Sequence, residues 1–376
     1  MKADKKKPRI YVCHTLYHVY VSLLKEMTVY GEDGKADIAL SDIFMDFGDL
    51  EERLSKAAVF DRVYRLHEVR DCDIPGLMKY KENRNNILIH LINRLIYTKK
   101  YGKAQDRFFT VDFKQYQDIF VYCDSDAIGY YLNYHHIYYH AVEDGLDCLR
   151  HFDAAHVDNE GHFALKAFLA RHNLIFIQNG YSKYCLDMEI NDDSFIRYRF
   201  DKYKVAPRKA MEDALAAGHK RKMLEIFLPQ ADEITRKLAD CGDCILFLTE
   251  AFPNVASIRE QVAREIIGEY CKGYQVVIKP HPRDNVDYER LFPECIVVHG
   301  KFPIEVLNFI GGIHFQKAVS IITSVMSSIR FVEEKINLGP HIWDKYEPVE
   351  NHIQMNRTWD ELHPGGGAYV ESASCP

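Results

Sequence analysis

Two adjacent carboxylates, Glu143 and Asp144, follow a short apolar run and stand directly before Gly145. Each carboxylate disfavours ionisation of the other, so the pKa of one of them is expected to rise toward the range of a general base. The glycine allows a sharp turn at the end of a predicted strand, where catalytic loops commonly lie. A loop in which Asp144 only caps a helix is the structural alternative. This triplet is the first candidate catalytic site.

His281 stands between two prolines at the end of an apolar run. Because a proline fixes its own φ and restricts the residue before it, Pro280 and Pro282 preset the direction of the imidazole. A histidine held in this way can donate to a phosphate or protonate a leaving oxygen, and Lys279 and Arg283 add positive charge beside it. The alternative is a rigid turn with an exposed histidine.

Four hydroxyl residues lie between a predicted strand and a predicted helix, namely Thr323, Ser324, Ser327 and Ser328. Hydroxyls and free backbone N–H groups at the start of a helix attract anions. The sequence contains neither of the two common glycine-rich phosphate motifs, so this cluster is the candidate for binding phosphate. Ordinary N-capping explains one or two of the four hydroxyls.

Three segments that look like metal sites have simpler interpretations. Asp124-Ser125-Asp126 precedes a predicted helix, where a capping role suffices. Cys241-Gly242-Asp243-Cys244 lacks a second cysteine pair and is more typical of a turn that enters a domain. His135, His136 and His140 lie in a strand-like segment, where their spacing does not converge. The sequence predicts neither a metal site nor a cofactor.

The elements that must position these residues alternate between short apolar runs typical of buried strands and runs typical of helices, which indicates a parallel sheet. The predicted strands are Arg9–Cys13, Ala36–Ser41, Arg62–Leu66, Asp118–Cys123, Ile137–Val142, Leu174–Gln178, Cys244–Leu248, Gln275–Ile278, Ile296–Val298 and Val319–Ile322. The predicted helices are Leu16–Tyr30, Asn85–Tyr101, Asp126–Tyr134, Ala256–Tyr270, Ile304–Ile310 and Val325–Glu334.

This alternation predicts an α/β fold with two Rossmann-like domains. Residues 1–205 form the N-terminal Rossmann-like domain, and the charged, Ala- and Lys-rich stretch 206–240 forms a helical linker. Residues 241–345 form the C-terminal Rossmann-like domain, and the tail 346–376 packs back on the surface. Parallel sheets joined in this way face a central cleft at the carboxyl ends of their strands. The expected layout is GT-B-like, which nucleotide-sugar transferases share with sugar-nucleotide epimerases.

Composition excludes several classes of function. The 376 residues carry a net charge of −7, which argues against nucleic-acid binding. No apolar stretch is long enough to span a membrane, and ten cysteines without a secretion signal are typical of reduced thiols in the cytoplasm. We therefore expect a cytoplasmic protein. A peripheral contact of the basic N-terminus with the cytoplasmic face of the inner membrane, and a homodimer, are both compatible with the sequence.

Three short motifs carry a family resemblance. In this order and at these separations, Glu143-Asp144-Gly145, His281-Pro282 and Ser327-Ser328 resemble the signature of bacterial sialyltransferases of the lipooligosaccharide and polysialic-acid groups. The resemblance extends to Ile10–Leu16, which is similar to the first strand and loop of those enzymes, and to Phe302-Pro303-Ile304-Glu305.

The resemblance implies a GT-B enzyme that transfers sialic acid from CMP-sialic acid to a glycan hydroxyl, with inversion and without a metal or cofactor. Glu143 is then the preferred base and Asp144 the second choice, while some relatives take the base from the segment that here holds Glu250. His281 would act on the departing phosphate. The expected donor-side residues are Lys279, Pro282, Arg283, Glu305, Thr323, Ser324, Ser327 and Ser328. The expected acceptor-side residues are Gly145, His14 and Thr15.

Other functions remain open at this point. A capsule transferase that uses a Kdo or glycerophosphate donor shares the Lys-Pro-His-Pro segment and the serine-rich loop. An epimerase would convert a nucleotide sugar without an acceptor, and a glycan-binding protein would release no CMP. The sequence indicates neither the acceptor glycan nor the linkage.

Overall fold

The computed structural model describes residues 6–81, 86–145, 149, 153–194, 196–238, 243–364 and 367–372. The chain divides into two compact units, Met1–His219 (unit 1) and Lys220–Pro376 (unit 2). This division lies inside the stretch 206–240, which the sequence analysis assigns to a helical linker. Each unit holds one sheet with helices packed on it, so the predicted α/β class is confirmed.

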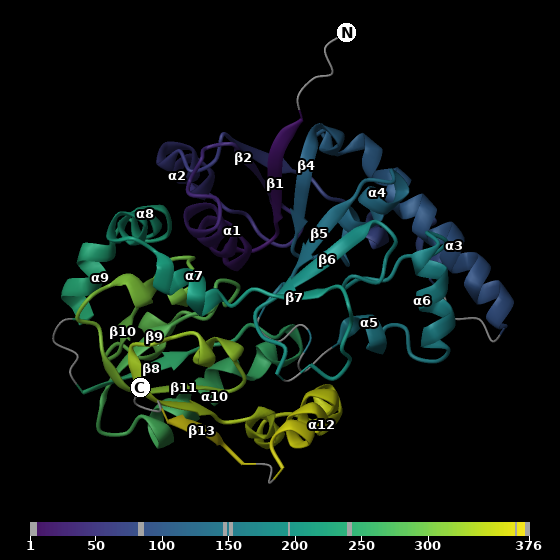
Figure 1. Cartoon of the computed structure of the whole chain (residues 1–376). Helices are drawn as coiled ribbons and strands as arrows, with labels where there is room; N and C mark the ends of the chain where they lie inside the picture. Colours follow the sequence, from purple (N-terminus) through teal and green to yellow (C-terminus); the bar gives the residue numbers. More distant parts are fainter. Residues whose placement is uncertain are drawn as a thin grey trace. The chain divides into compact units, whose positions relative to one another are not determined.

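Unit 1 contains a seven-stranded sheet in the order β3-β2-β1-β4-β5-β6-β7, and every strand pair in it is parallel (Figure 1). The strands are β1 (Lys7–Cys13), β2 (Ala36–Ser41), β3 (Arg62–Leu66), β4 (Tyr116–Val121), β5 (Tyr139–Val142), β6 (Cys185–Ile190) and β7 (Tyr203–Val205). Apolar side chains of the central strands, such as Val12, Ile119 and Ala141, form the core of this unit.

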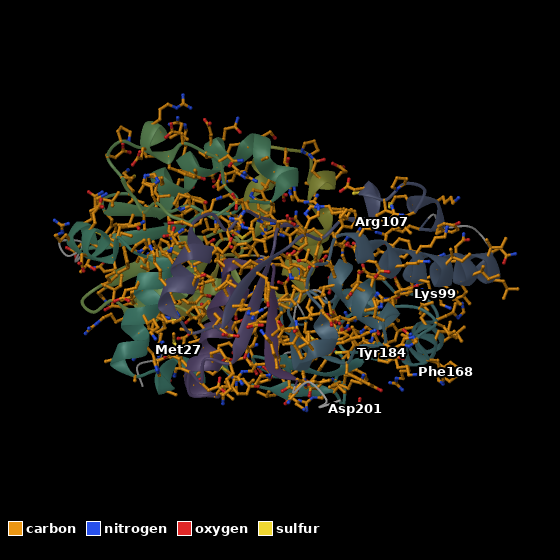
Figure 2. The ribbon with its side chains drawn as sticks, turned by 90° about the horizontal axis from the view of Figure 1, so that it is seen from above. Met27, Lys99, Arg107, Phe168, Tyr184 and Asp201 are labelled. Carbon is orange, nitrogen blue, oxygen red and sulfur yellow. The ribbon has the colours of Figure 1, made fainter. Side chains whose placement is uncertain are left out.

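The helices of unit 1 follow the strands in the manner of βαβ crossovers. They are α1 (Leu16–Thr28), α2 (Leu50–Ala57), α3 (Ile87–Ala104), α4 (Ala127–Tyr134), α5 (Ala154–Val157), α6 (Phe163–Arg171) and α7 (Arg208–Ala214). Helix α3 packs against α4 (Figure 1). Lys99 on α3 and Phe168 on α6 lie at the outer surface of the unit, as seen from above in Figure 2.

Unit 2 repeats the arrangement with a six-stranded sheet in the order β10-β9-β8-β11-β12-β13. The strands are β8 (Cys244–Leu248), β9 (Gln275–Lys279), β10 (Ile296–Val297), β11 (Phe315–Ser320), β12 (Val332–Asn337) and β13 (Tyr369–Ser372). Only β13 runs antiparallel to its neighbour. The tail therefore adds one edge strand to this sheet.

The α-helices of unit 2 are all shorter than α1 and α3 of unit 1. The α-helices are α8 (Ala217–Phe227, which begins in unit 1), α9 (Ala231–Leu238), α10 (Arg259–Glu265), α11 (Tyr288–Leu291) and α12 (Ile353–Leu362). Helix α10 lies between a 3-10 helix, Pro253–Ile258, and a π-helical turn, Ile266–Tyr270. Further 3-10 turns span Ile304–Phe309, Ser324–Ser327 and Pro340–Lys345.

Each sheet has one point where the order of its strands reverses. In unit 1 the chain runs outward from β1 to β3 and then returns to the other side of β1 at β4. In unit 2 the same reversal separates β8 from β11. Open α/β sheets bind ligands in the crevice at this reversal, beyond the carboxyl ends of the strands. The residues that follow β1, β4, β8 and β11 are therefore the candidates for binding a ligand.

Two predicted elements were wrong. Leu174–Gln178 is not a strand, because side chains satisfy its backbone: Phe176 N–H donates to Thr98 and Ile177 N–H donates to Ser182. The sixth strand comes later, at Cys185–Ile190. The predicted helix Val325–Glu334 is replaced by one 3-10 turn and strand β12.

The serine-rich stretch does not continue as a helix because its hydroxyls bond the local backbone. Thr323 Oγ1 accepts from Val325 N–H, and Ser328 Oγ donates to the Val325 carbonyl. The predicted strand Val319–Ile322 is shifted as well, since β11 ends at Ser320. The helix predicted over Ile304–Ile310 is a 3-10 helix. Among the described residues, no helix combines the length and apolar character needed to cross a membrane.

Candidate functional site

The carboxyl ends of β1, β4 and β5 in unit 1 gather two histidines, a cysteine and several carboxyl groups. Thr15 caps α1 and accepts a hydrogen bond from the backbone N–H of His18 at 3.3 Å. The His18 ring turns back toward the cap, where its Nδ1 accepts from the N–H groups of His14 (3.0 Å) and Thr15 (3.3 Å). A neutral His18 must therefore carry its proton on Nε2.

Asp144 accepts a hydrogen bond from this Nε2–H group. His18 Nε2 lies 2.5 Å from Asp144 Oδ1, and the Asp144 side chain is half exposed. Burial acts to raise the pKa of Asp144, but the hydrogen bond from His18 and the further interactions with His14 and Cys123 together lower it to about 2. Burial also lowers the pKa of His18, so its ring stays neutral. Asp144 is consequently an ionised acceptor and a weak base.

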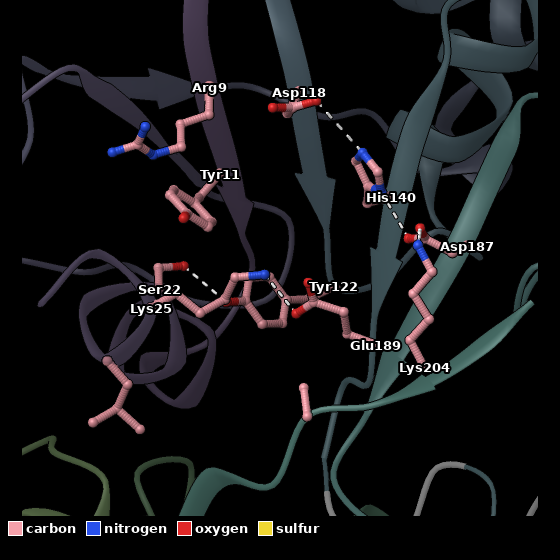
Figure 3. A network of polar contacts seen from close by, with 12 residues as sticks. Arg9, Tyr11, Ser22, Lys25, Asp118, Tyr122, His140, Asp187, Glu189 and Lys204 are labelled. Carbon is pink, nitrogen blue, oxygen red and sulfur yellow. Dashed lines mark hydrogen bonds and ion pairs between the residues drawn. The ribbon is translucent and has the colours of Figure 1, made fainter. Parts of the chain in front are cut away.

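The His18 ring rests on a polar network that continues into the sheet. It stacks on Tyr122 with ring centroids 4.5 Å apart, and the Tyr122 hydroxyl lies 2.9 Å from Ser22 Oγ. Nearby, the buried Lys25 donates to Glu189 of β6 at 2.5 Å (Figure 3). These contacts tie α1 to the ends of β4 and β6, so they hold His18 in one orientation.

His14, which follows β1, is paired with Glu68, which follows the edge strand β3. Its Nε2 lies 2.8 Å from Glu68 Oε1, and both side chains are completely buried. Glu68 also accepts from the N–H of Ile128 at the start of α4. Although burial acts to lower the pKa of His14, Glu68 raises it overall. The other ring nitrogen, His14 Nδ1, is buried and has no hydrogen-bond partner among the described residues.

Cys123 and Asp126 complete this cluster. Cys123 is buried, and burial raises the pKa of its thiol. Burial raises the pKa of Asp126 to about 7, with Glu68 and Asp144 contributing. Asp126 directly precedes α4, but its side chain makes no capping bond, contrary to the expected role. Ligand atoms of His14, His18 and Cys123 lie within 4.8 Å of one another, which is close enough to consider a metal ion.

The two neighbouring carboxylates of the acidic triplet lie in different surroundings. Glu143 is 4% exposed and accepts from the N–H of Asn191 at 2.5 Å, while its own N–H donates to the carbonyl of Glu189. Its carboxylate therefore joins β5 to the end of β6. Asp144 faces His18 instead, and Gly145 follows at the partly exposed end of this described segment. No hydrogen bond between the two carboxylates is observed among the described residues.

In unit 2, Glu250 lies at the strand-order reversal between β8 and β11. Its Oε1 accepts from Ser320 Oγ at 3.0 Å and from the N–H of Ile322. Its Oε2 is buried and has no hydrogen-bond partner among the described residues. Because burial dominates and no cation compensates, the pKa of Glu250 is raised to about 8. An unpartnered carboxyl oxygen with this pKa is suited to accept a proton near neutral pH.

His281 follows β9 and is held by the loop that contains Glu250. Its N–H donates to Thr249 Oγ1 at 3.0 Å, and Thr249 in turn donates to the buried Asp284 at 2.7 Å. Its Nδ1 accepts from the N–H of Arg283, so a neutral ring carries its proton on Nε2. Burial, with Arg283 and Lys279, lowers the pKa of His281 to about 4. His281 is thus a neutral hydrogen-bond donor at pH 7.

Lys279 does not face outward with the histidine. It is 5% exposed, donates to the carbonyls of Pro280 (2.9 Å) and Gly300 (3.2 Å), and lies 4.5 Å from the centre of the Phe302 ring. Burial lowers its pKa to about 8. Lys279 therefore shapes the turn before His281, whereas the exposed Arg283 is the cation that remains available on this loop.

The hydroxyl cluster lies on a 3-10 turn of four residues, and the expected α-helix N-terminus is absent from this described segment. Ser328 Oγ shares its single proton between the Val325 carbonyl at 2.8 Å and Glu305 Oε1 at 3.1 Å, so these two predicted donor-side residues do meet. Ser327 donates to the Ser324 carbonyl at 2.9 Å and is exposed, and Thr323 caps the turn. Any phosphate contact here must come from hydroxyls and turn N–H groups, without the dipole of a long helix.

Some residues of these clusters were not singled out from the sequence. Glu68, Cys123 and Asp284 have no motif around them, and they reach their partners only through the fold. The HxxxH spacing of His14 and His18 was the one visible signal. His140 belongs to the histidine-containing segment that was not predicted to bind a metal. In the structure it pairs with Asp187 at 2.6 Å on the sheet. The first two residues of the predicted turn, Cys241 and Gly242, fall outside the described residues.

The chain matches one known protein family. The family model described as glycosyltransferase family 52 matches residues 79–332. A Haemophilus influenzae protein described as uncharacterized is 29% identical over 108 residues, which are 27% of this chain and 34% of that protein. This chain thus spans about a third of the length of the curated relative that it matches.

Two solved structures share the fold. An α/β-galactoside α-2,3-sialyltransferase from Photobacterium phosphoreum is 12% identical, with a TM-score of 0.54 and coverage of 95% of both chains. The GT-B domain of a sialyltransferase from Photobacterium damselae is 14% identical, with a TM-score of 0.52 and coverage of 94% of this chain and 96% of that one. At such identities the likeness concerns the fold, and it confirms the predicted GT-B architecture.

Proposed function

Because this chain belongs to glycosyltransferase family 52, we propose that it transfers sialic acid from CMP-sialic acid to a hydroxyl of a surface glycan, with inversion. The observation that carries the proposal is the pair formed by Glu250 and His281 in unit 2. They follow neighbouring parallel strands, and Thr249 links their loops by hydrogen bonds. Glu250 is suited to accept a proton, and His281 is suited to donate a hydrogen bond.

In the proposed reaction the acceptor hydroxyl oxygen attacks the anomeric carbon of sialic acid from the face opposite to the phosphate. A new carbon–oxygen bond forms as the bond to the CMP phosphate breaks, and its electron pair leaves with the phosphate. The hydroxyl proton passes to the base. Attack and departure on opposite faces invert the anomeric configuration, and no net oxidation or added reactant is required.

We assign the base to Glu250 among the carboxylates suggested by the resemblance. A base must be deprotonated during turnover and still hold a proton well, which favours a pKa near the working pH. Glu250 meets this condition with a pKa of about 8 and a free oxygen. Asp144, with a pKa of about 2, holds a proton too weakly, and Glu143 is already bonded to the backbone of Asn191.

We propose that His281 and the residues around it stabilise the departing phosphate. The neutral ring offers Nε2–H, and Arg283 supplies charge, so the developing negative charge is stabilised without a metal ion. Ser328 and Glu305, which are bonded to each other, are proposed to hold the nucleotide with Thr323, Ser324 and Ser327. His14, Thr15 and Gly145 of unit 1 remain proposed acceptor-side residues.

The proposal places the enzyme in the cytoplasm, where CMP-linked donors are available, with the basic N-terminal residues as the segment that contacts the inner membrane. We further propose that it acts on lipooligosaccharide or capsule glycans and that it forms a homodimer. Residues 1–5 lie outside the described part of the chain.

A donor panel tests this function. CMP-sialic acid, CMP-Kdo, CDP-glycerol and UDP-sugars are offered separately while nucleotide release is measured. We expect release of CMP from CMP-sialic acid, faster with a galactose-terminated or sialylated acceptor and undiminished when EDTA is added to the assay. Turnover only with CMP-Kdo or CDP-glycerol would contradict the donor assignment. Interconversion of a UDP-sugar without an acceptor would contradict transfer itself.

The serine pair provides a prediction on binding. Changing Ser327 and Ser328 together to alanine removes two hydroxyls, and we expect CMP to bind about 1–3 kcal/mol more weakly, the range for lost bonds to a charged group. Calorimetric titration with CMP measures this, and Ser55→Ala on the exposed surface of α2 serves as the control. Unchanged CMP affinity in a folded double variant would restrict these serines to shaping the turn.

A further inference from the structure

Helix α3 exposes three aliphatic side chains at the edge of unit 1 (Figure 1). Leu88 is 67% exposed, Ile92 59% and Ile89 41%, although side chains of these types are usually buried. The buried Tyr97 and Tyr101 lie on the side of α3 that packs into the unit, so Leu88 and Ile92 lie on the outer side. We call the three aliphatic residues the aliphatic patch. Contiguous exposed apolar side chains of this kind often mark an interaction site.

Lysines continue the same face of α3 toward its carboxyl end. One ridge of the helix, defined by spacings of four, seven and four residues, holds Leu88, Ile92, Lys99 and Lys103. Lys99, Lys100 and Lys103 are all exposed, and Figure 2 shows Lys99 at the outer surface of the unit. We call these three residues the lysine patch. No carboxylate pairs with any of them within the part of the chain that the structure describes.

The charge of α3 differs from that of the whole protein. The 18 residues of the helix include four Lys or Arg side chains and no acidic one, whereas the chain has a net charge of −7. Arg94 is directed inward, where it donates to the carbonyl of Phe176 at 3.1 Å. The other three cations are the lysine patch. The outer face of α3 therefore combines aliphatic side chains with a local excess of positive charge, and its complement is an apolar partner with an anionic surface.

This composition favours a lipid bilayer over another protein. Protein interfaces are depleted of lysine, and their binding energy is concentrated in Trp, Tyr and Arg. Long lysine side chains beside an aliphatic patch are instead suited to a membrane surface, because they reach lipid phosphates while the patch enters the boundary with the acyl chains. Helix α3 lacks the apolar character of a membrane span, so the geometry fits a helix that lies in the interface.

We propose that the outer face of α3 docks unit 1 on a bilayer that contains anionic lipids. The aliphatic patch enters the boundary between headgroups and acyl chains, and the lysine patch contacts lipid phosphates. This surface is separate from the basic N-terminal residues and adds a second membrane contact to them. None of the groups assigned to the transfer reaction takes part. The inference therefore does not depend on the proposed activity, and vesicles without any substrate test it.

Sedimentation with vesicles tests the lysine patch. The full chain should bind phosphatidylcholine vesicles that contain about 30% phosphatidylglycerol, more weakly at high salt, and should bind pure phosphatidylcholine vesicles poorly. Changing the three lysines of the patch together to glutamine should weaken binding to the anionic vesicles roughly 100-fold. The control changes three lysines that are exposed elsewhere to glutamine, with the same effect on net charge, and should bind like the wild type. These are Lys56, Lys209 and Lys272.

A tryptophan at position 92 tests insertion of the aliphatic patch. The chain has two tryptophans, Trp343 and Trp359, and both are buried, so lipids should affect their fluorescence little. In Ile92→Trp, anionic vesicles with brominated acyl chains should quench the added fluorescence, because bromine quenches only a ring that reaches the acyl region. Ile353→Trp, at a 40% exposed position of α12, is the matched control and should not be quenched.

The outcomes separate the bilayer from other partners. Weakened binding in the α3 lysine variant, retained binding in the lysine control and quenching at position 92 alone support the proposal. A full chain that does not bind the anionic vesicles would overturn it, and so would equal losses in both lysine variants, because binding would then follow net charge alone.

A second copy of the chain is the alternative occupant of this face. Leu88→Ser combined with Ile92→Ser should weaken vesicle binding at least 10-fold and leave the oligomeric state unchanged, because two aliphatic contacts with the bilayer are lost. Leu362→Ser combined with Ile353→Ser, on the exposed side of α12, is the control. If the α3 variant instead converts a dimer to monomers and still binds vesicles like the wild type, the patch belongs to a dimer interface and the proposal is wrong.

Discussion

Replacing Glu250 by glutamine is expected to reduce sialic acid transfer by roughly 10²–10⁴-fold, the contribution typical of a positioned general base. Glutamine keeps the size of the side chain and still accepts from Ser320 and the Ile322 N–H, but it cannot take a proton. CMP binding should therefore stay close to that of the wild type. Initial rates at saturating donor, with CMP affinity measured separately, check both parts.

The matched variant is Glu143→Gln, which removes the other candidate base. Because Glu143 bonds the backbone of Asn191 in a buried place, we expect this change to affect the stability of unit 1 more than the chemical step. The opposite result, with transfer lost in Glu143→Gln and retained in Glu250→Gln, would reject Glu250 as the base. It would leave the proposed donor and reaction intact.

The raised pKa of Glu250 also predicts a pH dependence. Only the deprotonated carboxyl accepts a proton, so the transfer rate should rise with pH and level off above about 8. Stability should change in the other direction. Between the ordinary pKa of 4.5 and the folded value of about 8, the folded protein binds more protons than the unfolded chain, so its free energy of unfolding falls as pH rises through this range. Glu250→Gln should remove the contribution of this carboxyl to both slopes.

Replacing His281 by alanine is expected to lower turnover by about 100-fold or more with the fold intact. The ring is neutral at pH 7, with Nδ1 engaged by the Arg283 N–H, so Nε2–H is the donor that the departing phosphate loses. His281→Asn should recover little, because the shorter amide does not reach the same position. Turnover at saturating donor is the measurement.

His299→Ala provides the control, since this histidine is 61% exposed and pairs with Glu289 on the surface of unit 2. Its turnover should match the wild type. Near-normal turnover in His281→Ala would remove His281 from the mechanism. Arg283 would then be the first residue to test as the partner of the phosphate, because Lys279 is directed toward backbone carbonyls.

The local sequence alone predicted most strands of the two sheets and the loops that hold the candidate site residues. Apolar runs such as Ala36–Ser41 and Cys244–Leu248 are strands as expected. The strands of a parallel sheet are buried on both faces, so a short apolar run bounded by polar loops is typical of them. The alternation of strands and helices predicted two parallel sheets, and parallel sheets present their strand ends at one edge. His14, Glu250 and His281 could be selected for that reason.

Other features depended on residues far apart in the chain. Leu174–Gln178 has the composition of a strand, but Thr98 and Ser182 satisfy its backbone, and neither contact can be read from the run itself. The stretch after Ser328 was predicted as a helix, yet pairing with β11 makes it a strand. In both cases tertiary contacts outweighed local preference.

The sequence by itself determined the types of chemical group available and the strand ends on which they lie. Only the tertiary structure decided which of them meet and how each titrates. Glu143 and Asp144 are neighbours in sequence, but one bonds Asn191 and the other His18, so their charges are not paired as a catalytic dyad. Glu250 acquires its pKa of about 8 from burial near β11, about seventy residues away. Desolvation and long-range hydrogen bonds set these properties, and both arise only when the strands come together.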